Sequence, residues 1–463
     1  MKKYIAAIDL GTTKIVAIVG ERLPSGKFRV LGHYERPSKG ILRGEVYNID
    51  GVAEAVQPAL EEVEKLTGIK MSEVYVGIAG QRVRCVKNRF EIPRNNYNKT
   101  ISEDEISELV KKMHEIETSP GEEVLHVVPQ RYTVDEWSDI VPVGAQGRKL
   151  NAEFTVFLGK TSAADRTRKA IENMGLKLER TILEPLASAE AVLDEHERDM
   201  GVLLVDIGGG TTDLVIYRNN IVRHIAVIPF GGNVITKDIQ EVCSILPRQA
   251  EQLKVQYGSC YAAMAVDNKI IAIPGICGRE PREVSFKLLA QIIEARMDEI
   301  MEAVMFEVER SGYADKLSAG MVVTGGGANL GNLPEYILAK TGLEARRGRP
   351  VYLTSDSSEE VLCSAYATAA GLLMKGYEYE EEKEKQLVYV ENPISTLSGL
   401  WKKLFPPNEK KEVKPEQRNL WPEAELPPPV PPKPKPPKPP KPERPPRPEN
   451  RMLDIIFNVD NEV

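Results

Sequence analysis

The chain repeats one pattern of apolar and polar positions in two places. Residues 5–16 and 203–215 each contain an apolar run that ends in Asp, a turn rich in Gly and Thr, and a second apolar run. Short apolar runs bounded by turn residues are typical of buried strands, so each copy predicts a tight β-hairpin. We expect the two hairpins to face each other across a cleft, because their glycines allow a close approach of the backbone.

The remaining apolar periodicity predicts a mixed α/β chain. We expect helices at about 50–67, 102–117, 233–245 and 283–311, and strands at 74–79, 124–134 and 152–158. Ser102 followed by Glu105 is a capping box, which marks the start of a helix. Residues 321–330 predict a buried strand that enters a turn of three glycines, with a helix following near Pro334. One helical stripe is assigned to core packing: Ala163, Ala170, Ile171 and Met174.

The end of the chain has a different composition. Between Pro406 and Pro448 lie 18 of the 33 prolines, interleaved with Lys and Arg. Such a segment cannot bury a core, so we expect residues 406–450 to be a disordered, extended polyproline spacer. Display of proline motifs to a partner is the alternative.

Two short amphipathic segments flank this spacer, at 394–405 and 451–463. In the first, an apolar stripe at helical spacing lies beside two lysines: Leu397, Leu400, Trp401, Leu404 and Phe405, with Lys402 and Lys403. This pattern favours a helix that lies on an anionic membrane, although docking on the body of the protein is the alternative. The second segment is a rival anchor, but its acidic residues disfavour an anionic surface.

Length, charge and cysteine usage exclude several classes of protein. A chain of 463 residues can bury large cores in two or more domains. The net charge of −7 argues against nucleic acid as the main partner. The five cysteines are scattered, which predicts neither a disulfide framework nor a zinc site. No apolar run reaches the length of about 18 residues that a membrane-spanning helix needs.

The hairpin turns carry the chemistry of a phosphate site. Glycine backbone N–H groups can line a concave anion site, and threonine hydroxyls add donors. The candidate phosphate ligands are Gly11, Thr12, Thr13, Lys14, Gly208, Gly209, Gly210, Thr211 and Thr212. Asp9 and Asp206 end the two strands, too close to phosphates without a cation, so we expect Mg²⁺ held largely through water. Two ordinary hairpins are the structural alternative.

Three weaker signals complete the candidate site. The glycine turn supplies Gly325, Gly326, Gly327 and Asn329, which can press against a flat ring or a phosphate. Glu251 and Lys254 share one helix face and could bind a ribose or adenine edge, or form only an exposed salt bridge. Glu184 precedes a proline that can start a helix, and its carboxylate could orient a water molecule or simply be exposed.

These motifs, in this order, resemble those of the actin-like ATPase superfamily, with residues 366–371 similar to its second connecting helix. Residues 79–85, 124–135, 142–147 and 230–239 are most similar to the FtsA family of bacterial cell-division proteins. The resemblance covers about 3–376 and implies a two-lobed actin-like (ribonuclease H-like) α/β fold. The implied parts are 1–83 and 161–200 (lobe 1A), 84–160 (an inserted, SHS2-like 1C subdomain), 201–229 and 313–376 (lobe 2A), 230–312 (2B) and a linker at 377–393.

The resemblance also implies a function. It implies ATP as the cofactor, with Gly232 and Lys237 among its contacts, and at most a weak ATPase activity. It implies self-assembly into filaments, binding of the FtsZ C-terminal peptide by the 2B region, and anchoring of the Z ring at the cytoplasmic face of the cell membrane. Other division proteins would bind the 1C subdomain. A sugar or carboxylate kinase, a heat-shock-class chaperone and a pilus-assembly adaptor are the alternatives within the same superfamily or its relatives.

Overall fold

The computed structural model describes residues 4–79, 83–94, 97–138, 141–266, 269–275 and 280–391. The amphipathic segments at 394–405 and 451–463 and the spacer at 406–450, including the stripe from Leu397 to Phe405, lie outside these residues. Within them, no helix is both long and apolar enough to cross a membrane.

The first sheet is built around the first predicted hairpin. Its described strands run in the order β11-β6-β1-β2-β3. Their bounds are β1 (Ile5–Leu10), β2 (Lys14–Arg22), β3 (Phe28–Pro37), β6 (Glu73–Ile78) and β11 (Lys177–Leu183). β1 pairs with β2 antiparallel and with β6 parallel. The helices α1 (Ile49–Thr67) and α3 (Thr161–Asn173) bury their apolar faces in the same core cluster as this sheet.

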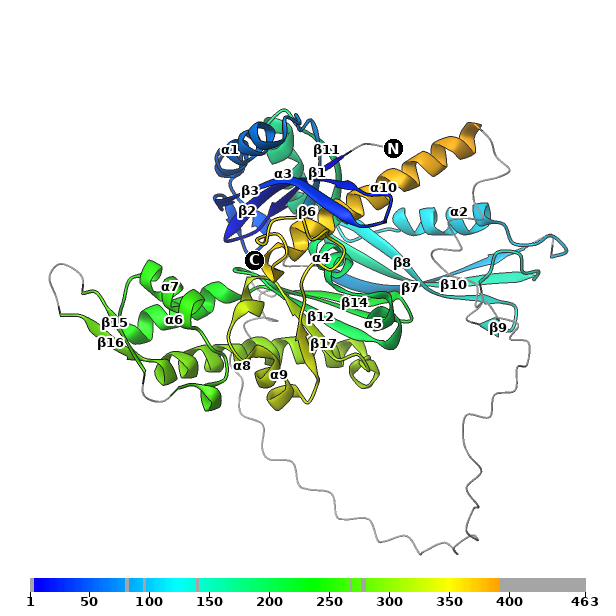
Figure 1. The fold of residues 1–463 in the computed structure, drawn as a ribbon. Helices are drawn as coiled ribbons and strands as arrows, with labels where there is room; N and C mark the ends of the chain where they lie inside the picture. Colours follow the sequence, from blue (N-terminus) through cyan, green and yellow to red (C-terminus); the bar gives the residue numbers. More distant parts are fainter. Residues whose placement is uncertain are drawn as a thin grey trace, which may run out of the picture. The chain divides into compact units, whose positions relative to one another are not determined.

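The second sheet repeats the arrangement of the first. Its described strands run in the order β14-β13-β12-β17-β18. Their bounds are β12 (Val202–Ile207), β13 (Thr212–Arg218), β14 (Ile221–Ile228), β17 (Met321–Thr324) and β18 (Ala345–Arg347). β12 pairs with β13 antiparallel and with β17 parallel, as β1 does with β2 and β6. Both predicted hairpins are therefore confirmed, and each occupies the same position in its own sheet (Figure 1).

A third, antiparallel sheet is inserted between β6 and α3 (Figure 1). Its described strands run in the order β7-β10-β8-β9, with bounds β7 (Arg84–Pro93), β8 (Glu122–Val134), β9 (Trp137–Ser138) and β10 (Lys149–Lys160). The helix α2 (Glu103–His114) packs on one face and starts at the predicted capping box of Ser102 and Glu105. The insertion also contacts the second sheet, because Gln130 donates to the Val222 carbonyl over 2.8 Å.

The helices of the second half follow the second hairpin. Their bounds are α5 (Glu195–Met200), α6 (Gly232–Cys243), α7 (Pro247–Tyr257), α8 (Phe286–Ser311) and α9 (Leu333–Thr341). α8 starts later than predicted, because residues 282–285 pair with β15 (Ile270–Ile273) as strand β16 (Arg282–Ser285). Ser285 then caps α8 by accepting the Leu288 N–H, and Gly312 ends it in the left-handed conformation.

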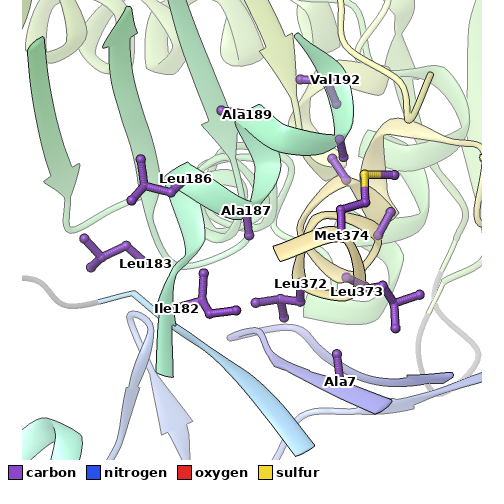
Figure 2. Close-up of a cluster of buried hydrophobic side chains, with 14 of the residues drawn as sticks. Ala7, Ile182, Leu183, Leu186, Ala187, Ala189, Val192, Leu372, Leu373 and Met374 are labelled. Carbon is purple, nitrogen blue, oxygen red and sulfur yellow. The ribbon is translucent and has the colours of Figure 1, made fainter. Parts of the chain in front are cut away.

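Two helices carry the chain between the two halves, α4 (Glu184–Val192) and α10 (Ala367–Glu391). They cross so closely that a Cβ on Gly371 would overlap the Ala187 carbonyl. Figure 2 shows the apolar cluster around this crossing, in which Leu186, Leu372 and Met374 are buried. Because interiors are close-packed, this contact fixes the spacing of the two helices.

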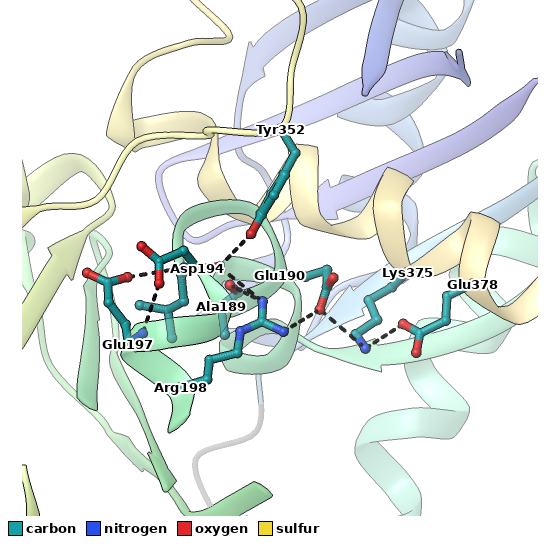
Figure 3. A network of polar contacts seen from close by, with 9 residues as sticks. Ala189, Glu190, Asp194, Glu197, Arg198, Tyr352, Lys375 and Glu378 are labelled. Carbon is teal, nitrogen blue, oxygen red and sulfur yellow. Dashed lines mark hydrogen bonds and ion pairs between the residues drawn. The ribbon is translucent and has the colours of Figure 1, made fainter. Parts of the chain in front are cut away.

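A network of charges also joins the crossing helices. Glu190 of α4 contacts Lys375 of α10 over 3.6 Å and Arg198 of α5 over 3.2 Å, as Figure 3 shows. Burial opposes the charge on Lys375, but Glu190 and Glu378 outweigh it and raise its pKa. Burial likewise opposes the charge on Glu190, and its two cationic partners lower its pKa. Each charge therefore depends on its partner for its place in the interior.

The helix α10 does not end near residue 376, where the linker was predicted to begin, but continues to Glu391. Tyr377 is 1 % exposed, and the Tyr75 hydroxyl donates to Glu380 over 2.6 Å. Arg180 lies 3.8 Å from the centre of the Tyr379 ring. The part of the predicted linker up to about Lys383 is thus packed on the first sheet, which its charged sequence did not indicate.

The crossing of α4 and α10 gives a stability prediction. Gly371→Ala should lower the free energy of unfolding by about 1–3 kcal/mol, because the added methyl group must displace the backbone of α4. Urea unfolding followed by circular dichroism measures this. Gly326→Ala is the matched control, since a Cβ there meets nothing within 4 Å. Equal unfolding midpoints for the two variants would contradict the packing argument.

Candidate functional site

The turns of the two hairpins meet. A Cβ on Gly209 would overlap the Thr13 hydroxyl, and a Cβ on Gly210 would lie 2.5 Å from the Thr12 hydroxyl oxygen. Thr12 Oγ1 in turn accepts the Gly44 N–H over 3.0 Å. The absence of side chains at these two glycines therefore allows two threonine-bearing turns from separate sheets to face each other, as the sequence predicts.

The second turn is fastened to the start of α6. Gly232 N–H donates to the Gly208 carbonyl over 2.8 Å, and Asn233 N–H donates to the Gly209 carbonyl over 2.8 Å. Thr13 Oγ1 lies 3.5 Å from the Asn233 side-chain oxygen, so α6 also approaches the first turn. The first N–H groups of α6 are thus engaged by the second turn and the residue before the helix, while the helix dipole still favours an anion nearby. The sequence analysis did not single out Asn233.

Four carboxyl groups lie buried beside these turns: Asp9, Asp206, Asp213 and Glu184, each no more than 9 % exposed. Asp9 and Asp206 end β1 and β12, and Glu184 begins α4. Asp213 was missed by the sequence analysis, although it is a charged residue inside an otherwise apolar strand. The alternative that Glu184 is an exposed acid is wrong, because the side chain packs over Gly77, which has no Cβ to displace it.

Burial and mutual repulsion weaken these acids. Burial, with the charge of Asp206 adding to it and that of Lys14 opposing it, raises the pKa of Asp9 to about 7. Burial raises the pKa of Asp213 and of Glu184 well above the ordinary values, and neighbouring carboxylates add to both. Glu184 Oε1 and Asp213 Oδ1 are buried without a hydrogen-bond partner. A site of this kind suits a cation, which would relieve the repulsion.

Asp206 is contacted from both crossing helices. Ser188 of α4 donates to Asp206 Oδ2 over 2.6 Å, and Thr368 of α10 donates to the same oxygen over 3.2 Å. Burial raises the pKa of Asp206, while the two hydroxyl groups oppose that rise. Neither Ser188 nor Thr368 was singled out from the sequence, because each is a small hydroxyl residue in an apolar helix.

The third predicted element also reaches this junction. Gly325 has a φ of 80°, and a Cβ there would collide with Asp206 Oδ1. Gly327 lies against the side chain of Ile207, and residues Gly326–Asn329 form a short 3-10 helix in which Asn329 is exposed. The predicted strand, glycine turn and following helix are therefore confirmed, with α9 starting at Leu333.

The candidate residues on α6 and α7 differ in how close they lie to the turns. Lys254 contacts Glu251 over 2.8 Å and the Gly232 carbonyl over 3.0 Å, which places this pair at the start of α6, beside the second turn. Lys237, in contrast, lies on the exposed side of α6 and pairs with Glu241 at 3.7 Å. The structure does not bring its ammonium group to the turns.

Two further candidates make internal contacts. Lys14 binds Glu35 over 2.8 Å and lies 3.5 Å from the centre of the Tyr366 ring. Thr212 is fully buried and donates to the Phe230 carbonyl over 2.9 Å. The Thr212 hydroxyl therefore holds β13 to the segment before α6 and is not presented at the mouth of the turn, because the first residue of β13 already points into the core.

The duplicated sheets, the two facing turns and the two crossing helices define the actin-like fold. Among solved structures of similar fold, a PilM–PilN type IV pilus biogenesis complex gives a TM-score of 0.53 at 16% identity, over 80% of this chain and 98% of that one. MreB5 of Spiroplasma citri bound to AMPPNP gives 0.51 at 17% identity, over 83% and 99%.

Sequence relatives identify the particular family. The profile described as "Cell division protein FtsA" matches residues 203–371, and the one described as "SHS2 domain inserted in FTSA" matches residues 80–158. The chain is 34% identical to the cell division protein FtsA of Neisseria meningitidis, over 80% of this chain and 90% of that protein. It is 32% identical to FtsA of Escherichia coli, over 86% and 96%. The chain belongs to the FtsA family of cell-division proteins, and the predicted fold class is confirmed.

The raised pKa of Asp9 gives a pH prediction for the protein in EDTA without nucleotide. Between pH 4 and about 7 the unfolded chain loses the Asp9 proton while the folded chain keeps it, so stability falls as the pH rises through this window. Asp9→Asn should therefore raise the free energy of unfolding at pH 7.5, by up to about 4 kcal/mol, and have little effect at pH 4. Chemical unfolding at both pH values measures this.

Asp315→Asn is the control for this prediction, because Asp315 is exposed. The free energy of unfolding of this variant should match that of the parent chain at both pH values. A loss of stability in Asp9→Asn that is the same at pH 4 and pH 7.5 would show that the Asp9 charge is not disfavoured in the folded protein.

Proposed function

We propose that this chain is an ATP-binding, actin-like cell-division protein that forms filaments at the cytoplasmic face of the cell membrane and anchors the Z ring there. The observation that carries the proposal is the meeting of the Thr12–Thr13 and Gly209–Gly210 turns beside four buried acids. Backbone N–H groups on facing turns suit a polyphosphate, and the MreB5 structure of the same fold was solved with AMPPNP.

Each part of the site has a proposed role. The turns at Gly11–Thr13 and Gly208–Thr211 hold the phosphates, and the glycine turn at 325–327 with Asn329 lies against adenosine. Glu251 and Lys254 bind the ribose or adenine edge. Asp9 and Asp206 hold Mg²⁺ through water. Within the described ranges, no group of three Asp, Glu, His or Cys side chains is arranged to coordinate a metal ion directly. This is compatible with a cation held mainly by water and phosphate.

The bound Mg²⁺ would neutralise phosphate charge and relieve the repulsion among the buried acids. Glu184, whose Oε1 has no partner, is the candidate for orienting a water molecule towards the terminal phosphate. Asp213, whose Oδ1 is also unpartnered, is a second acceptor for an ordered water in the same place. We propose at most a slow hydrolysis, as the resemblance to the family implies.

Closure of the two halves around nucleotide is proposed to favour the polymer. In a filament, many weak anchors act on one membrane, so the avidity exceeds the affinity of a single helix. The amphipathic segment 394–405, with its Trp401 and Lys402–Lys403, is the proposed anchor, and the long α10 carries the chain towards it. The inserted subdomain is proposed to contact other division proteins.

The FtsZ C-terminal peptide has a proposed site between α6 and α8. A cavity of about 390 Å³ is lined there by Val242, Ile292 and Ala295 among charged residues. Arg296 spans the two helices through Asp238, at 2.6 and 2.9 Å. The lining mixes these apolar residues with polar and charged ones, which offers a short peptide both apolar and polar contacts.

Membrane binding is tested by sedimentation with anionic liposomes, with and without Mg·ATP. The full chain and a chain lacking 451–463 should pellet with the liposomes, more so with ATP. A chain ending at Asn392 should stay in solution, because it lacks the apolar stripe and its lysines. Loss of binding on removal of 451–463 alone would move the anchor to the terminus. A full chain that stays in solution with ATP would overturn the membrane proposal.

Peptide binding is tested with a fluorescent peptide of the FtsZ C-terminal residues from the same cell. Val242→Asp should weaken binding about tenfold or more, because it places a charge among the apolar residues that line the cavity. Val255→Asp is the matched control, as Val255 is a similarly exposed valine on α7 outside the cavity. Equal affinities for the two variants, measured by fluorescence anisotropy, would place the peptide elsewhere.

A further inference from the structure

Three side chains from three elements form a closed set of contacts at the base of the candidate site. Ser188 lies in the middle of α4, Thr368 lies in the first turn of α10, and Asp206 is near the end of β12. Ser188 Oγ lies 2.6 Å from Asp206 Oδ2 and 2.9 Å from Thr368 Oγ1, and Thr368 Oγ1 lies 3.2 Å from the same carboxylate oxygen. We call this set the hydroxyl clamp.

The hydroxyl clamp restricts the Asp206 carboxylate in two ways. Both hydroxyl groups donate to one oxygen, Oδ2, from two directions. Together they restrict the rotation of the carboxylate plane. The other oxygen, Oδ1, lies against Gly325, where a Cβ would collide with it. Ser188 is fully buried and Asp206 is 8 % exposed, so water is largely excluded from the contact between them, while Thr368 is half-buried. Rotation of the carboxylate would break both contacts at once.

The hydroxyl clamp also connects Asp206 to the two crossing helices, because α4 carries Ser188 and α10 carries Thr368. α4 leaves the first sheet, and α10 returns to it from the second. Their crossing at Gly371 and Ala187 is close-packed, and the clamp lies beside it, because Ser188 directly follows Ala187 on α4 and Thr368 lies about one turn before Gly371 on α10. A force on Asp206 is therefore passed directly to both crossing helices, because no loop or solvent layer separates them.

We propose that Ser188 and Thr368 are positioning residues for the cation-linked half of the nucleotide site, which orient the Asp206 carboxylate and bind both crossing helices to it. This inference rests on the proposed function, since it assumes that Asp206 serves a cation that accompanies the nucleotide. It adds Ser188 and Thr368 to the candidate site and gives a reason for a hydroxyl side chain at each of these positions. Ser188→Ala or Thr368→Val would keep nearly the same shape without orienting the carboxylate.

The test compares nucleotide binding with and without the cation in the full chain. The affinity for AMPPNP is measured by calorimetry in Mg²⁺ and again in EDTA. The dissociation constant in EDTA divided by the one in Mg²⁺ reports the contribution of the cation. Thr368→Val keeps the shape of the side chain and removes the hydroxyl group. Thr368→Ser keeps the hydroxyl group and removes the methyl group. Ser188→Ala removes the second hydroxyl group.

We expect Thr368→Val and Ser188→Ala each to reduce this ratio about tenfold, with the affinity in EDTA nearly unchanged. Thr368→Ser should retain the parent ratio within about twofold. A merely structural role for the hydroxyl groups would lower the melting temperature and leave the ratio unchanged, and that result would overturn the proposal. A Thr368→Ser variant as impaired as Thr368→Val would also overturn it.

Failure of the proposed function gives a different result. If the parent chain binds no AMPPNP in either buffer, the nucleotide site itself is wrong, and the inference falls with it. If the parent binds AMPPNP with a clear Mg²⁺ dependence that none of the three variants alters, only the role of the hydroxyl clamp is wrong. Should Ser188→Ala not fold, the comparison of Thr368→Val with Thr368→Ser decides the question alone.

Discussion

The arrangement of this protein depends on the burial of four carboxyl groups where its two halves meet. Isolated buried carboxylates are unfavourable by several kcal/mol, and neighbours of the same charge increase the cost. Here Asp9 and Asp206 come from strand ends, Asp213 from a strand and Glu184 from a helix start, so no single element accounts for the group. Such a cluster suits a cation, which would offset part of the repulsion among the acids.

Around this cluster, the close packing of α4 against α10 links the two halves. The first and second sheets have the same strand order around their hairpins, and α4 and α10 cross between them with Gly371 against Ala187. The half-buried pair of Glu190 and Lys375 adds a contact that is lost if the helices separate. Interiors packed this closely move between discrete arrangements more readily than they deform, so a shift at the acid cluster would move both crossing helices together.

The inserted sheet and the extended α10 attach the functional surfaces to this core. The insertion leaves the first half of the chain but contacts the second sheet through Gln130 and Val222, so a change between the halves also acts on it. Near its start, α10 contacts Asp206 through Thr368, and it packs on the first sheet as far as about Lys383 before it ends at Glu391. The helix that contacts the acid cluster is therefore also fastened to the first sheet, where the Tyr75 hydroxyl donates to Glu380.

The sequence by itself determined the two hairpins, the glycine turn, the helix capped at Ser102 and the family, because each of these is written in local spacing of apolar, Gly and polar residues. It also named Asp9, Asp206 and Glu184. Only the tertiary structure decided that Asp213 joins them, that Ser188 and Thr368 hold Asp206, and that Lys237 and the Thr212 hydroxyl point elsewhere. It also decided that α10 extends through Tyr377 into the predicted linker. These outcomes depend on contacts between residues far apart in the chain, where burial and charge act across elements and no local pattern records them.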